Sequence, residues 1–346
     1  REGAIGARLR LVTRLLGAPL LASSDRRSGM SGRAVGYLRS MNLAQRIEER
    51  GSEFLLFALT PPRVTVSSQR AEEIANLTRQ RLASLHLDGL VLYDIDDESD
   101  RNSAERPFPF LPTIDPATFW DQYLKDQTSS VVIYRAVGKY EESDIQAWLR
   151  AQDVDQVLTV FVGASSRNKQ ASTSLVRSQE LWAQVRPELP LGGVAIPERH
   201  TRRGEEHLRL IAKQEAGCSF FVTQVVYDVN AAKNLVSDYR YECDARGLTP
   251  VPIVFTFSVC GSLKTLEFLS WLGVDVPRWI QNDLRHSDDT LAASYEHSVR
   301  AARELIEYCR RLGIPFGINV ESVSIRLAEI GASVRLAETL SHVLRR

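Results

Sequence analysis

Eight short apolar runs recur along the chain, and segments with a helical pattern separate them. The runs are continuously apolar rather than alternating, which is typical of strands buried on both faces of a parallel sheet. The intervening segments repeat apolar residues every three or four positions, as amphipathic helices do. The runs are Phe54–Leu59, Gly89–Tyr93, Val131–Ala136, Val157–Val162, Gly193–Ile196, Phe220–Thr223, Val251–Phe255 and Phe316–Asn319.

Eight strand–helix units most simply close into an α/β (β/α)8 barrel, the TIM barrel, because parallel strands need right-handed crossovers. An open doubly wound sheet is the rival architecture, and the even spacing of the units disfavours it. A closed barrel needs about 250 residues, and the chain has 346. We therefore expect an N-terminal extension over residues 1–45, disordered or helical, and a barrel over residues 46–346.

The start of the chain differs in composition from the rest. Residues 1–36 are rich in Arg, Gly, Ser and Ala and contain only two acids, Glu2 and Asp25. This composition resembles an organelle transit peptide. Translation from upstream of the true start, or a disordered tail, is the preferred interpretation, because the only methionines are Met30 and Met41. Targeting is the alternative.

The overall charge is balanced, with 43 Lys and Arg residues against 43 Asp and Glu residues. A nucleic-acid-binding protein should present a basic face, so no nucleic-acid partner is expected. No apolar run approaches the ~18 residues that span a bilayer, so no membrane partner is expected. The cysteines match no zinc or redox spacing, which predicts no metal site and suits a reducing, cytoplasmic location. They are Cys218, Cys243, Cys260 and Cys309.

Ligands of (β/α) barrels bind at the C-terminal ends of the strands, so the residues that follow the apolar runs form the candidate site. These residues contain no Ser-His-Asp order and no H-E-x-x-H, Walker A or G-x-G-x-x-G motif. Gln224 ends the sixth run, and its amide offers both a donor and an acceptor, as the edge of a pterin requires. A buried glutamine satisfied by backbone groups is the alternative.

A helical segment after the fifth run places Glu206, Arg209 and Lys213 about one turn apart on one face. Lys213 could pair with a pyrophosphate and Glu206 with a ribose hydroxyl, whereas the alternative is an ordinary solvated face. His200 precedes this segment. It is either a loop histidine or a donor to a ligand.

Several co-linear segments resemble one known family at matching spacings. They are Ala-Ile-Pro-Glu-Arg-His (195–200), Lys-Gln-Glu-Ala-Gly-Cys (213–218), Phe-Val-Thr-Gln-Val-Val-Tyr-Asp-Val (221–229), Pro-Arg-Trp (277–279) and Phe-Gly-Ile-Asn (316–319). Together they make the chain similar to methylenetetrahydrofolate reductases over about residues 54–343.

The resemblance implies a flavin-binding barrel that takes a hydride from NAD(P)H onto FAD. The flavin then passes the hydride to 5,10-methylenetetrahydrofolate, which gives 5-methyltetrahydrofolate. A folate one-carbon compound is thus the expected substrate, and a homo-oligomer is compatible with the sequence. The resemblance assigns Gln224 to the pterin and Ile318 to the neighbourhood of the nicotinamide or folate ring. It assigns FAD binding to His200, Glu206, Arg209 and Lys213.

Two carboxylates of the family pattern are missing from this chain. Ala58 stands where the family has the glutamate that protonates the folate nitrogen, and Ala164 stands where it has an aspartate near the flavin. Losing a general acid typically costs ~10²–10⁴ in rate. In one hypothesis the chain is an active reductase whose replacement acid is Asp94, Asp96 or Glu321.

A second hypothesis is a non-catalytic folate- or flavin-binding homologue that serves as a regulatory or complex subunit. A third is an unrelated (β/α) barrel enzyme with another ligand. The reductase is the leading expectation, and Asp94 and Glu321 are its catalytic candidates.

Overall fold

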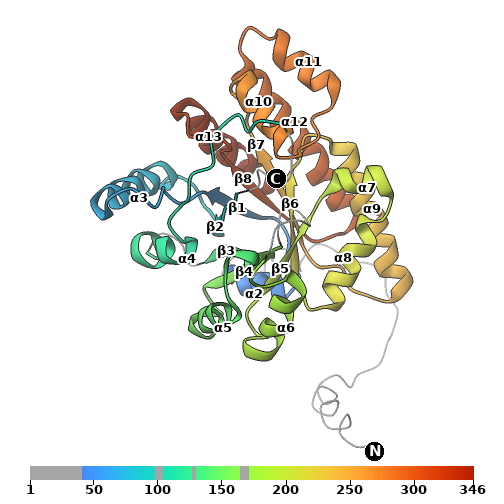
Figure 1. The fold of residues 1–346 in the computed structure, drawn as a ribbon. Coiled ribbons are helices and arrows are strands. Elements are labelled where there is room, and N and C mark those ends of the chain that lie inside the picture. The colour runs from blue at the N-terminus through green and yellow to red at the C-terminus, as the bar shows by residue number, and fades with distance from the viewer. Residues whose placement is uncertain (1–40, 98–103, 127–129, 164–170) are drawn as a thin grey trace, which may run out of the picture. The chain divides into compact units, whose positions relative to one another are not determined.

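The computed structural model describes residues 41–97, 104–126, 130–163 and 171–346. Eight parallel strands close into a barrel in chain order, with β1 paired to β8 (Figure 1). This closure confirms the expected TIM barrel and excludes the open sheet, which would leave two unpaired edges. The strands are β1 (Phe54–Leu59), β2 (Gly89–Leu92), β3 (Val131–Ala136), β4 (Val157–Val162), β5 (Leu191–Ala195), β6 (Phe220–Val225), β7 (Ile253–Ser258) and β8 (Phe316–Glu321).

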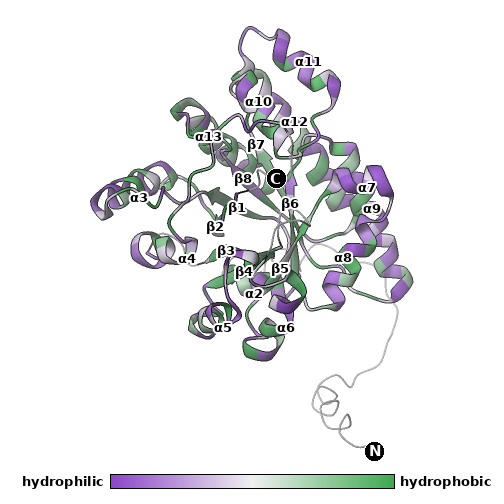
Figure 2. Cartoon of the chain, viewed as in Figure 1, coloured by the Kyte–Doolittle hydropathy of each residue, from purple (hydrophilic) through white to green (hydrophobic). Residues whose placement is uncertain are grey.

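Helices surround the strands, and their apolar sides face the barrel while their polar sides face outward (Figures 1 and 2). None of the helices in the described ranges is long and apolar enough to cross a membrane. The helices are α2 (Leu43–Glu48), α3 (Ser68–Leu82), α4 (Pro116–Phe119), η2 (Trp120–Leu124), η3 (Val137–Lys139), α5 (Glu142–Ala151), α6 (Leu175–Val185), α7 (Pro197–Arg203), α8 (Glu206–Glu215), α9 (Val229–Arg246), α10 (Leu263–Trp271), α11 (Arg278–His286), α12 (Thr290–Leu312) and α13 (Leu327–Leu344).

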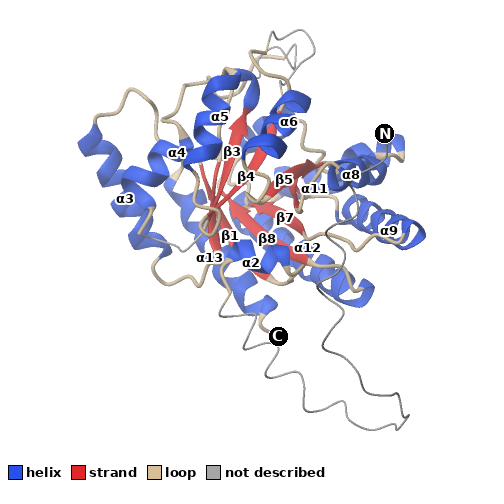
Figure 3. Ribbon diagram, turned by 90° about the horizontal axis from the view of Figure 1, so that it is seen from below, coloured by secondary structure: helices blue, strands red, loops and turns tan. Residues whose placement is uncertain are grey.

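The described barrel unit starts at Met41, and residues 1–40 of the expected extension lie outside the described residues. Asn42 caps helix α2, because its side chain accepts a hydrogen bond from the backbone N–H of Gln45. Leu43 and Ile47 of this helix pack into the inner core of the barrel. Helix α2 therefore belongs to the barrel (Figure 3).

The barrel has two apolar layers: an inner core inside the ring of strands and an outer core between the strands and the helices. Alternate residues of each strand serve the two layers, since side chains along a strand point to opposite faces. Phe54, Leu56 and Ala58 of β1 belong to the inner core, whereas Leu55 and Phe57 belong to the outer one.

Packing in the lower part of the lumen leaves no room for a second large side chain. A Cβ atom added to Gly317 of β8 would lie only 2.2 Å from the ring of Phe54. Glycine at this position therefore lets Phe54 fill the lumen beside β8. A ligand must bind above this layer, at the C-terminal ends of the strands.

Candidate functional site

The uppermost inward-facing layer of the barrel is polar. It is built around Glu321 and Asn319 of β8, with Thr256 of β7 and Tyr93 after β2 beside them. Strand β8 is two residues longer than the sequence predicts, so Glu321 is a strand residue rather than a loop residue. Strand pairing places Glu321 next to Ala58 of β1. Residues paired in this way project to the same face, and Ala58 belongs to the inner core.

Hydrogen bonds link these side chains into one cluster, which we call the lumen cluster. The Tyr93 hydroxyl donates to the Glu321 carboxylate. The Asn319 amide nitrogen donates to the Tyr93 hydroxyl and to Thr256 Oγ1, each at 3.2 Å. The ring of Tyr134 packs edge-on against that of Tyr93, with their centroids 4.9 Å apart.

The amide oxygen of Asn319 takes no part in these hydrogen bonds. It is buried and has no hydrogen-bond partner in the described structure. The residue is fully buried, with 0% exposure. A buried acceptor without a partner costs free energy that a ligand N–H can recover. Asn319 therefore points to a ligand that donates a hydrogen bond into the lumen.

Burial also changes the acid–base properties of the lumen cluster. It raises the pKa of Glu321 to about 7, and the hydrogen bond from Tyr93 opposes that shift only in part. Burial, followed by the nearby Glu321 carboxylate, raises the pKa of both Tyr93 and Tyr134 well above their usual value. Both tyrosines therefore remain neutral donors, and Glu321 keeps its proton closer to neutral pH than an ordinary glutamate does. Such a carboxyl group can donate a proton to a ligand in the lumen.

Asp94, the other catalytic candidate, follows Tyr93 at the end of β2, but its side chain bonds to residues outside the lumen cluster. Its carboxylate accepts hydrogen bonds from the backbone N–H of Ala136 at 2.9 Å and from the Tyr140 hydroxyl at 2.8 Å, and it pairs with Lys139. Its side chain is 1% exposed. With all these partners inside the protein, Asp94 stabilises the β2–β3 end and has no free atom for a substrate. Asp96 lies in the loop beyond it.

The expected FAD residues gather around the end of β5, but their polar groups bond to the protein itself. Glu206 has 0% exposure, accepts from the backbone N–H of Ile196 at 3.2 Å, and pairs with Arg199 at 3.4 Å. The Nε atom of Arg209 lies 3.9 Å from the same carboxylate. Lys213 donates to the carbonyl of Val194, and burial lowers its pKa.

His200 is also turned inward, with 5% exposure, and its Nε2 lies 3.0 Å from the Asp238 carboxylate. The Glu206 carboxylate is already paired with Ile196 and Arg199, and the Lys213 amine is held by a backbone carbonyl. In this arrangement the four residues do not fit FAD as an open cradle.

Gln224 and Ile318, the expected substrate-binding residues, differ in their placement. Gln224 is half-buried where β6 shifts register, and its Nε2 donates to the Leu272 carbonyl at 3.1 Å. Ile318 belongs to the outer core and is fully buried. Because it faces the helices, Ile318 has no surface for a ring bound in the lumen. Its neighbour Asn319 faces the lumen instead.

Glu198, in the first turn of α7, lies in the 195–200 motif, but the sequence assigned it no role. It is 3% exposed, both of its carboxylate oxygens lack partners among the described residues, and burial raises its pKa to about 7. Like Asn319, it is a buried polar group that the protein leaves unsatisfied. Ala164, the site of the second missing carboxylate, lies outside the described residues.

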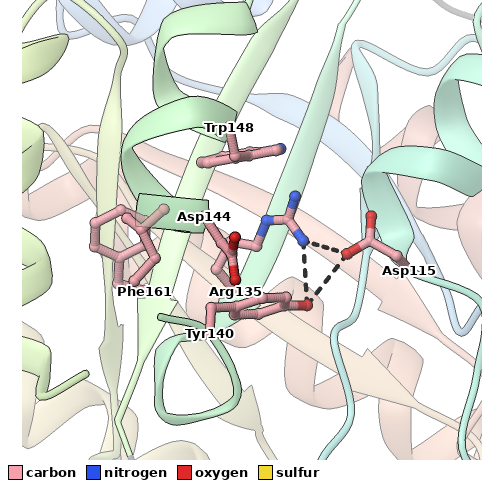
Figure 4. Close-up of a pocket in the computed structure, with 7 residues that line it drawn as sticks. Asp115, Arg135, Tyr140, Asp144, Trp148 and Phe161 are labelled. Carbon is pink, nitrogen blue, oxygen red and sulfur yellow. Dashed lines mark hydrogen bonds and ion pairs between the residues drawn. The ribbon is translucent and has the colours of Figure 1, made fainter. Parts of the chain in front are cut away.

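A separate cavity of about 140 Å³ lies outside the ring of strands, against α5 (Figure 4). The Arg135 guanidinium lies between the rings of Tyr140 and Trp148, 5.0 and 4.4 Å from their centroids, and pairs with Asp115. Small-molecule sites usually measure about 300–1,000 Å³. This cavity is too small for a folate, and its cation is already paired, so it belongs to the packing of the outer layer.

Comparisons with known proteins connect this geometry to one family. Residues 166–321 match the family model described as methylenetetrahydrofolate reductase. A protein of Clostridium thermocellum, described as uncharacterized and as binding two copies of 5-methyl-5,6,7,8-tetrahydrofolic acid, is 40% identical. The match covers 87% of this chain and 99% of that chain, with a TM-score of 0.78.

Two other solved structures match at low sequence identity. A 2,3-dimethylmalate lyase is 12% identical over 87% of this chain and 94% of its own, with a TM-score of 0.41. A GH113 β-1,4-mannanase is 10% identical over 84% and 98%, with a TM-score of 0.48. No curated protein sequence matches the chain. The family-model match spans the motifs around β5, β6 and β8, and the chain belongs to the methylenetetrahydrofolate reductase family.

Proposed function

We propose that the chain binds a reduced folate of the 5-methyltetrahydrofolate class at the C-terminal mouth of its barrel. The unsatisfied acceptor of Asn319 within the lumen cluster carries this proposal. The ligand class comes from the 40% identical relative, whose length this chain covers almost completely.

The chemistry of a reduced pterin complements the lumen cluster. The pterin ring offers N–H donors, which the Asn319 oxygen lacks, and it offers ring nitrogen and carbonyl acceptors. Protonated Glu321 and the Tyr134 hydroxyl supply donors for those acceptors. A site built to hydrogen-bond such groups also discriminates against ligands that lack them, because its own polar atoms are then left unpaired.

Glu321 is our candidate for the role of the missing family carboxylate. It lies on β8 directly beside Ala58 of β1 and projects to the same side. The carboxyl group that the family carries on β1 would thus be replaced by one on the neighbouring strand β8, and both positions face the lumen. Its raised pKa suits hydrogen-bond donation to a folate nitrogen near neutral pH.

We favour a folate-binding protein over a flavin-dependent reductase. Reduction of methylenetetrahydrofolate by NAD(P)H would require bound FAD. Three of the four residues expected to hold FAD are engaged within the protein: Glu206 by Ile196 and Arg199, Lys213 by Val194 and His200 by Asp238. Folate binding at the lumen cluster needs none of those residues to move.

The test is anaerobic calorimetric titration of the purified full chain with 5-methyltetrahydrofolate. We expect saturable binding by protein that carries no visible flavin absorbance. Failure of folded protein to bind would refute the proposal. A yellow preparation that oxidises NAD(P)H and reduces methylenetetrahydrofolate would establish the reductase instead.

A further inference from the structure

We propose that His200, His207 and Asp238 form a site for a divalent cation of the zinc type. The three residues lie on three different helices: α7, α8 and α9. Each offers one ligand atom, and the three atoms lie within 4.8 Å of one another. This site is distinct from the lumen cluster, because its helices belong to the layer around the barrel.

Local backbone geometry brings the two histidines together. Helix α7 ends at Gly204, which adopts a φ of +67° and whose N–H bonds back to the His200 carbonyl. Glycine tolerates this left-handed conformation, so the chain turns sharply and α8 begins two residues later. As a result, the ring of His207 lies edge-on to that of His200, with their centroids 5.1 Å apart.

Unsatisfied nitrogen atoms are the second observation that points to a ligand. The Nδ1 atoms of both histidines are buried and have no hydrogen-bond partner in the described structure. His200 is 95% buried, and its other nitrogen, Nε2, lies 3.0 Å from Asp238. Buried polar atoms are nearly always satisfied in folded proteins. Each histidine therefore keeps a ring nitrogen without a partner, and a bound cation would complete the cluster.

The donor types decide which cation fits. Imidazole nitrogen with a single carboxylate oxygen suits zinc and similar transition metals, whereas calcium and magnesium prefer oxygen ligands alone. Zinc bonds of about 2.0–2.1 Å place tetrahedral donor atoms roughly 3.3 Å apart. The three ligand atoms lie within 4.8 Å of one another, so their side chains need to move only a short distance inward to bind a zinc ion. His207 is half-exposed and Asp238 is exposed, so a cation can enter from solvent.

The site would fasten α7 to α8 and α9 directly after β5. Three protein ligands leave a fourth position for water. Because α7 carries Glu198 toward the end of β5, the cation would also fix the orientation of that buried carboxyl group.

The experiment uses the full chain, stripped with EDTA and titrated with Zn²⁺ against a chromogenic chelator, together with thermal unfolding. We compare the wild type with His207→Ala and Asp238→Asn, whose positions are accessible enough for the variants to fold. His286→Ala is the matched control, because His286 is exposed and lies outside the cluster.

We expect one equivalent of Zn²⁺ to bind and to raise the Tm of the wild type and of the His286 control. Loss of a direct ligand should weaken binding by more than the roughly 10–100-fold typical of outer partners. Co²⁺ in the same site should give the intense visible absorption of tetrahedral coordination. Wild-type protein that binds no Zn²⁺, or His207→Ala protein that binds it as tightly as the wild type, would overturn the proposal.

Discussion

The lumen cluster and the two residues Glu206 and Lys213 near the end of β5 all include buried ionisable groups, yet the protein satisfies these groups to different degrees. Around β5, Glu206 has three polar partners and Lys213 donates to a carbonyl. In the lumen, Asn319 keeps an unpaired acceptor, and Glu321 has a pKa raised to about 7. Satisfied buried charges stabilise a fold, whereas unsatisfied ones indicate a place where a ligand completes the structure.

The largest expected effect tests the structural role of Glu206. Replacing Glu206 by Ala leaves the Ile196 N–H without its acceptor and Arg199 without its counter-charge. We expect the free energy of unfolding to fall by about 2–4 kcal/mol, measured by urea denaturation. Glu215→Ala, at an exposed position of the same helix, should change it by less than about 0.5 kcal/mol. Unchanged stability in Glu206→Ala would remove the distinction between the two regions.

The next effect concerns the pH dependence contributed by Glu321. Its pKa is about 7 in the folded protein against an ordinary 4.5, so the folded state holds the proton more tightly than the unfolded state. Stability is therefore lost as pH rises from the ordinary value through the folded one. Glu321→Gln should raise the free energy of unfolding at pH 8 by on the order of 1–3 kcal/mol, with little change at pH 5. Equal effects at both pH values would contradict a buried, protonated carboxyl group.

A pair of neighbouring variants separates the lumen from the outer layer. Asn319→Ala removes the free acceptor, and we expect affinity for 5-methyltetrahydrofolate to fall by about 5–150-fold, which corresponds to 1–3 kcal/mol. Ile318→Val should leave affinity unchanged while it costs about 0.5–1.5 kcal/mol of stability. The reverse pattern in calorimetric titration would show that Ile318, not Asn319, faces the ligand.

The smallest effect is expected from moving the carboxyl group between strands. Glu321→Ala alone should weaken folate binding by roughly tenfold. The double variant Ala58→Glu with Glu321→Ala returns a carboxyl group to the strand on which the family carries it, and it should recover part of that affinity. A double variant that binds as weakly as Glu321→Ala would mean that the two positions do not serve one site.

Sequence patterns predicted the barrel well because each strand appears in the sequence as a continuous apolar run. Those same runs conceal which residues face inward, since both faces of each strand are apolar and no alternation marks the lumen. The resemblance assigned Ile318, and the position after the second run suggested Asp94, whereas Tyr93 and Asn319, one residue away, belong to the lumen cluster.

Motif resemblance assigned His200, Glu206 and Lys213 to FAD binding but did not show whether their polar atoms are free. Only the contacts made by Ile196, Val194 and Asp238 decide that. The sequence did not predict the proposed cation site either, because its residues are brought together only by the fold. His207 and Asp238 come from different helices and form no metal-binding spacing in the sequence.

The most direct test of folate binding at the lumen cluster is the pH dependence of 5-methyltetrahydrofolate binding, compared between the wild type and Glu321→Gln. If protonated Glu321 donates to the ligand, wild-type affinity should decline above pH 7, by at most about tenfold per pH unit. The Glu321→Gln profile should be flat over the same range. A wild-type affinity that rises with pH, or a Glu321→Gln profile identical to that of the wild type, would contradict this account.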